Sequence, residues 1–152
     1  MQTQESIKVT GKLSIVVRDE SGAVKDQRDV NNLVVTTGKT FIASSLLKTT
    51  TNSPAAMSHM AVGTGATAAA AGDTALGAEI AASRTALGTA TSSGAVVTYA
   101  ATFAAGVGTG AVTEAGIFNA SSAGTMMCRT VFSVVNKGAN DSMTITWTVT
   151  IS

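Results

Sequence analysis

The most regular pattern in the chain lies in residues 142–152, where apolar side chains alternate with Ser and Thr without exception. The apolar members are Met143, Ile145, Trp147, Val149 and Ile151. Only a β-strand has a side-chain period of two residues, so the pattern predicts a strand with one apolar face and one uncharged polar face. A long uncharged strand at a sheet edge would invite aggregation, and we therefore expect other strands or a partner to flank it.

Similar alternation elsewhere, interrupted by turn-forming residues, predicts about seven more strands. They are expected at residues 7–17, 24–35, 57–62, 78–87, 95–105, 112–119 and 126–135. The Asp-Glu-Ser-Gly turn at residues 19–22 joins the first two into a hairpin. Eight strands with regular glycine turns predict an all-β fold, an antiparallel β-sandwich that is jelly-roll-like, with a plain Greek-key sandwich as the alternative.

One short helix is predicted after the second strand, opened by Thr-Thr-Gly at residues 36–38. The apolar residues that follow at near-helical spacing are Phe41, Ile42, Leu46 and Leu47. A loop at residues 48–56 ends the helix. Residues 63–72 are rich in Gly, Ala and Thr, which predicts a long flexible loop or an arm.

The composition favours one domain, residues 1–152, that shares its surface with other subunits. Charged residues form 12% of the chain, against about a quarter in an average protein, while 45% of residues are hydrophobic. A monomer normally keeps more charge on its surface for solubility. Residues 1–6 are polar and precede the first strand, so we expect them to form a mobile N-terminal arm.

Charge, hydropathy and cysteine content argue against several classes of function. The net charge is +1 and the ten basic residues are scattered, which does not fit a nucleic-acid binder. No long apolar run indicates a membrane span, and residues 1–6 lack the features of a signal peptide, so we expect folding in a cytoplasm. One Cys and one His cannot form an internal disulfide or a usual zinc cluster, and no metal or cofactor is expected.

Two glycine motifs resemble nucleotide-binding sequences. Residues 63–68 fit the relaxed G-x-G-x-x-A pattern, and Glu79 could imitate the ribose-binding acid, but no helix is predicted directly after the glycines. Residues 38–40, Gly-Lys-Thr, end like a P-loop, yet Leu33 stands where the opening glycine would be. Both are interpreted as structural.

A catalytic reading would combine Cys128 as nucleophile with His59 as base and Glu114 or Asp73 as the orienting acid. Cys128 fits better as a small buried side chain of a strand, and His59 as a hydrogen-bonding group at a sheet surface. No constellation supplies nucleophile, base and anion site together, so we predict no enzymatic activity and no catalytic residue. Glu114 and Arg129 lie on neighbouring predicted strands and are expected to form a cross-strand ion pair.

Three parts of the chain together form a familiar pattern. The first is NLVVTTGK at residues 32–39. The second combines MAVGTG at residues 60–65 with DTALGAE at residues 73–79. The third runs from EAGIFNA at residues 114–120 into MMCRTVF at residues 126–132. These segments resemble small structural proteins of tailed bacteriophages.

The resemblance spans about residues 22–152 and consists of strands and glycine turns without a catalytic signature. It implies a capsid decoration, or cement, protein on the outer surface of the virion, made in the cytoplasm of the host bacterium. The implied partners are the major capsid protein and further copies of the chain, as a homotrimer. The alternative is a tail, baseplate or fibre-associated adaptor. A carbohydrate-binding jelly roll is a more remote alternative, because one Trp and one Tyr offer few platforms for sugar rings.

Overall fold

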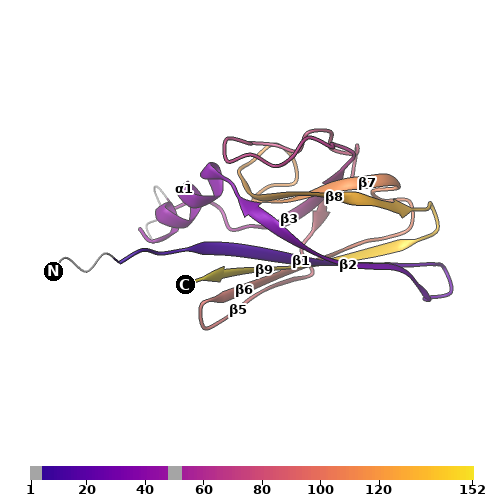
Figure 1. Cartoon of the computed structure of the whole chain (residues 1–152), viewed down its shortest axis with the longest axis horizontal. Coiled ribbons are helices and arrows are strands. Elements are labelled where there is room, and N and C mark those ends of the chain that lie inside the picture. The colour runs from indigo at the N-terminus through magenta and orange to yellow at the C-terminus, as the bar shows by residue number, and fades with distance from the viewer. Residues whose placement is uncertain (1–4, 48–52) are drawn as a thin grey trace.

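The computed structural model describes residues 5–47 and 53–152, which form an antiparallel sheet of nine strands together with one helix (Figure 1). The strands are β1 (Val9–Arg18), β2 (Val24–Val34), β3 (His59–Gly63), β4 (Thr85–Ala86), β5 (Thr89–Ser93), β6 (Val96–Phe103), β7 (Gly110–Phe118), β8 (Met126–Lys137) and β9 (Ser142–Ile151). The helix is α1 (Thr36–Ser45). Across the sheet the order is β4-β3-β7-β8-β2-β1-β9-β6-β5.

The sheet curls at β2, which belongs to both of its halves. The lower half consists of β2, β1, β9, β6 and β5, and the upper half consists of β4, β3, β7, β8 and the end of β2. Most of β2 pairs with β1 in a hairpin, whereas Leu33 and Val34 at its end pair with Arg129 and Cys128 of β8. In Figure 1, β7 and β8 consequently lie above β1, β9 and β6. A single apolar core fills the space between the two halves, with contributions from both.

The centre of the lower half is β9, which pairs with β1 on one side and β6 on the other. This confirms that the alternating segment is flanked by other strands. Trp147 is completely buried between its pairing partners Leu13 and Tyr99. Its neighbours on the apolar face, Ile145 and Val149, are buried as well. The uncharged Thr face points outward, where Thr144 shares a hydrogen bond of 2.9 Å with Thr102 of β6.

The structure confirms an all-β antiparallel fold with one short helix and the hairpin formed by the first two strands. A continuous sheet of nine strands takes the place of the predicted eight, and the jelly-roll topology is not confirmed. β5 could not be predicted, because this edge strand consists of small residues, mostly Thr and Ser, that are all exposed and show no apolar alternation.

The strand predicted at residues 78–87 is wrong in most of its length. Only the two residues of β4 and a single bridge at Glu79 are extended and paired. Ala82 has a φ of 56°, in the left-handed region that interrupts a strand. The Ser83 hydroxyl then donates to the Val62 carbonyl at 3.0 Å, so that side-chain contacts hold this segment against β3.

The helix α1 is seated on β8 through a glycine. Val35 occupies the N-cap position without a side-chain hydrogen bond, and Gly38 is the buried residue of the helix. A Cβ atom at Gly38 would collide with the backbone carbonyl of Met127, so only glycine permits this close approach. The predicted arm at residues 1–6 lies largely outside the described residues; Glu5 and Ser6 are exposed and precede β1.

Replacing Trp147 by Ala is expected to lower the free energy of unfolding by about 3–5 kcal/mol, because it opens a large cavity in the core. Val134→Ala on β8 is the control, since Val134 is exposed and should change stability by less than about 1 kcal/mol. Urea unfolding followed by circular dichroism measures both. Equal stability of the two variants would contradict the position of Trp147 at the centre of the core.

Candidate functional site: the Glu114–Arg129 network

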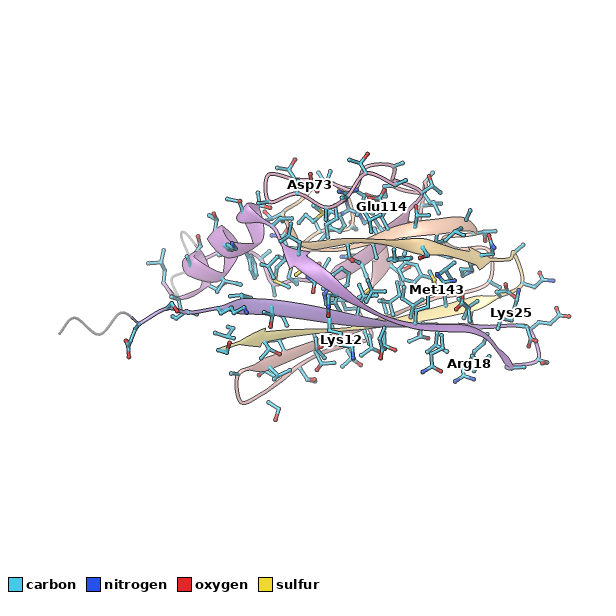
Figure 2. The ribbon with its side chains drawn as sticks, viewed as in Figure 1. Lys12, Arg18, Lys25, Asp73, Glu114 and Met143 are labelled. Carbon is cyan, nitrogen blue, oxygen red and sulfur yellow. The ribbon has the colours of Figure 1, made fainter. Side chains whose placement is uncertain are left out.

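Glu114 and Arg129 lie on the outer face of the upper half of the sheet, on β7 and β8. A register shift between Val112 and Glu114 changes the alternation of β7, so that Val112 faces the core and Glu114 the opposite side. The segment between β3 and β4 covers this face, and Figure 2 shows Asp73 in that segment above Glu114. Glu114 is fully buried and Arg129 nearly so.

The Glu114 carboxylate accepts five hydrogen bonds. Its Oε1 atom accepts from the backbone N–H groups of Gly65 at 3.0 Å and Ala78 at 2.6 Å. Its Oε2 atom accepts from the backbone N–H of Gly77 at 2.9 Å and from Nε and Nη2 of Arg129 at 3.0 and 2.8 Å. One carboxylate therefore fastens both ends of the loop at residues 65–78 to the sheet.

The Arg129 guanidinium fastens the middle of the same loop. Its Nη1 atom donates to Asp73 at 2.7 Å, and its Nη2 atom also donates to the Thr67 carbonyl at 3.1 Å. Asp73 accepts a further hydrogen bond, of 2.8 Å, from the backbone N–H of Ala70. The predicted pair of Glu114 and Arg129 is confirmed, but it is the centre of a buried network rather than an isolated pair on the sheet surface.

The network keeps its groups ionised. Burial by itself would raise the pKa of Glu114, but the N–H groups of Ala78, Gly77 and Gly65 and the Arg129 guanidinium together lower it below the usual value. The pKa of Asp73 is also lowered, first by the Ala70 N–H and then by Arg129. Burial opposes the charge of Arg129, yet its two carboxylate partners raise its pKa.

The glycines that resemble a nucleotide-binding motif serve this internal carboxylate. A Cβ atom at Gly63 or Gly65 would lie 2.5 Å from the Oε1 atom of Glu114. Glycine lets the backbone approach an anion closely, which is also its role in phosphate-binding loops. Here the anion is the protein's own side chain. Glu79, which could have imitated the ribose-binding acid of a nucleotide site, is instead paired with Arg84 at 2.7 Å.

Residues 64–72 form an irregular loop, whereas Gly63 belongs to β3, and the loop lies on the sheet rather than projecting as an arm. In addition to its contacts with Glu114 and Arg129, the Thr113 hydroxyl donates to the Gly65 carbonyl at 2.9 Å. The Thr36 N–H at the start of α1 donates to the Ala71 carbonyl at 2.8 Å. These contacts could not be predicted from the sequence, because the loop makes them mainly through its backbone N–H and carbonyl groups.

The structure does not bring the other candidate residues together. Cys128 is buried in the core, and this burial raises the pKa of its thiol to about 12. His59, the first residue of β3, forms a 2.8 Å hydrogen bond with Ser58, and β7 separates β3 from β8. The carboxylates of Glu114 and Asp73 bind Arg129, so neither orients His59.

Sequence reasoning missed a second cluster, centred on Arg84. This side chain forms a two-point ion pair with Glu79, lies 3.5 Å from the ring centre of Phe118, and donates to the carbonyls of Ala120 and Ala123. Ala123 lies in the turn after β7 and has a φ of 50°, which is strained for a residue other than glycine. Because Arg84 binds the carbonyl of Ala123, it supports this turn. A lone Arg in an irregular segment gives no pattern from which these contacts could be predicted.

Residues 5–47 and 53–152 contain no group of three or more His, Cys, Asp or Glu side chains placed to hold a metal ion. Within the same residues, no helix has the length and apolar character needed to cross a membrane.

Replacing Glu114 by Gln is expected to lower the free energy of unfolding by about 3 kcal/mol or more, because Arg129 then stays buried without its main counter-charge. Asp29→Asn is the matched control. Asp29 pairs with Lys12 at 3.3 Å, but both side chains are more than half exposed, so the loss should stay below about 1 kcal/mol. Similar losses of unfolding free energy in the two variants, measured by urea unfolding, would show that the buried network stabilises the fold no more than an exposed ion pair does.

Acid should loosen the network. Carboxylates with lowered pKa values stabilise the folded state fully above their unfolded pKa values of 4.5 for Glu and 3.8 for Asp, and this contribution is lost as the pH falls through the lower folded values. The melting temperature, measured between about pH 7 and about pH 3, should therefore decrease once the pH drops below about 4. The Glu114→Gln variant should show a shallower fall, and parallel curves would contradict this assignment.

No known protein family, curated protein sequence or solved structure matches this chain.

Proposed function

We propose that this chain is a structural virion protein of a tailed bacteriophage that binds and stabilises the outer surface of the capsid as a decoration, or cement, protein. One observation supports a structural role: Glu114, Asp73 and Cys128 are either hydrogen-bonded within the protein or buried, whereas large apolar side chains are exposed together at one end. The phage assignment itself rests on the resemblance of residues 22–152.

The polar half of this observation concerns the Glu114–Arg129 network. Five donors surround the Glu114 carboxylate, and the guanidinium of Arg129 binds two carboxylates and a carbonyl. A catalytic base needs a free lone pair directed at a substrate, and a nucleophilic Cys needs an accessible thiolate. Glu114 is occupied, and Cys128 is buried with a raised pKa. These groups stabilise structure rather than support chemistry.

The apolar half concerns the end of the molecule at which α1 lies, close to the start of β1 and the end of β9 (Figure 1). Ile7 is 82% exposed, Leu46 80%, Leu47 57% and Ile151 36%. Ile42 links three of them, because it lines one groove with Ile7 and another with Leu46 and Ile151. Clustered exposed apolar side chains are typical of surfaces that bind another protein.

The major capsid protein is the proposed main partner, and further copies of the chain, as a homotrimer on the capsid exterior, are the second. A tail, baseplate or fibre-associated adaptor is the alternative, since the same surface would serve there. The carbohydrate-binding alternative loses support, because Trp147 is completely buried and cannot stack on a sugar ring.

Co-sedimentation with capsids of the parent phage assembled without this protein tests the proposal. The purified chain should pellet with them saturably and raise their resistance to heat, because a cement protein links subunits that would otherwise separate. Electron cryomicroscopy of the decorated particle should then show the chain on the outer capsid surface. Binding to purified tails in place of capsids would favour the adaptor, and binding to neither would refute a virion role.

A further inference from the structure

Two grooves beside α1 share Ile42 and differ in chemistry. The first, of about 220 Å³, is almost entirely apolar and is lined by residues of α1, β6, β8 and β9 and by Leu46, which follows α1; Tyr99 and Val149 are among these residues. The second, of about 530 Å³, lies between α1 and the residues that lead into β1, and Lys8 and Lys39 line it. A groove without charge thus adjoins a groove with two positive charges.

The apolar groove exists because α1 covers the end of the sheet incompletely. Gly38 is the buried residue of the helix, while Phe41 and Ile42 are only half-buried. At the C-terminal end of α1, the side chain of Leu46 is almost fully exposed to solvent. Removing apolar surface from water is favourable, so a partner side chain placed here would gain by completing the packing.

Charge identifies the partner that fits. Among the described residues that line the two grooves, the charged ones are Lys8 and Lys39, and both are exposed. A second copy that docked the same surface against itself would bring lysines toward lysines, at an energetic cost. A segment with carboxylates would instead be attracted to them.

We propose that these grooves form one docking surface for a segment of the capsid surface that carries an aliphatic side chain beside carboxylates. The aliphatic side chain enters the groove at Leu46, Tyr99 and Val149, and the carboxylates face Lys8 and Lys39. The assignment of this segment to the capsid rests on the proposed function. The chemistry of the docking surface rests on the structure of the chain alone.

The first experiment tests the chemistry without a capsid. The blocked tripeptide Asp-Leu-Glu is titrated into the full-length protein, and amide shifts are followed by nuclear magnetic resonance. Shifts should concentrate at Lys39, Ile42, Leu46 and Tyr99, and the blocked tripeptide Lys-Leu-Lys should leave the same amides unchanged. Equal shifts with both peptides, or no shift at α1 with either, would overturn the proposal.

The second experiment tests the partner by co-sedimentation with undecorated capsids. Leu46→Ser should weaken binding about tenfold or more, as expected for an apolar anchor, while Val24→Ser at an exposed site on β2 should not. Lys39→Gln should weaken binding and reduce its dependence on salt, unlike Lys12→Gln, which removes the same charge from an exposed site on β1. Melting curves verify that all four variants are folded.

The outcomes separate this inference from the proposed function. If the original chain pellets with capsids and Leu46→Ser pellets equally well, the docking surface is wrong and the function stands. If the acidic peptide maps to α1 but the chain binds no capsid, the function is wrong and the docking chemistry stands. An oligomer that Leu46→Ser dissociates in analytical ultracentrifugation would replace the capsid segment by a second copy of the chain and overturn the proposal.

Discussion

The structure depends on a carboxylate placed where water cannot reach it. Moving an ionised carboxylate out of water costs several kcal/mol, and only a complete set of hydrogen bonds and an opposite charge can offset this. Glu114 obtains them from Arg129 and from three backbone N–H groups of the covering loop. The requirement explains why glycines stand at positions 63 and 65, where any side chain would occupy the space of the carboxylate.

The same network determines how the two halves of the sheet differ. In the upper half the covering segment adds a second, smaller apolar cluster on the outer face, where Leu76 packs with Phe118, Ala61 and neighbouring residues. A Cβ atom at Gly116 would lie 3.0 Å from the Leu76 side chain, so this contact also depends on a glycine. The lower half keeps its outer face open, and there the uncharged Thr side chains of β9 meet water and the neighbouring strands. The upper half is covered on both faces and the lower half on one.

Sequence reasoning succeeded where a local rule decides the structure. The period of two predicts β9 and the hairpin of β1 and β2, and the turn chemistry predicts where they end. It failed where contacts between distant segments decide, as at Ser83, which is held by Val62, and at β5, whose exposed residues need no apolar period. Residues 114 and 129 could be paired from the predicted strands, but their burial could not be foreseen. It arises from the loop at residues 65–78, whose Gly, Ala and Thr residues carry almost no signal of their own.

The position of the network also explains why the end of the molecule near α1 can remain incomplete. The largest core side chain, Trp147, lies on β9, and Glu114 and Arg129 lie on β7 and β8, whereas Leu46 follows the last residue of α1. Because the stability of a domain is unevenly distributed, an element with few buried contacts can be left open at small cost to the whole. A fold whose buried ion pair is fully hydrogen-bonded can therefore present apolar surface at one end and still keep a single native structure, and that is the arrangement a binding module needs.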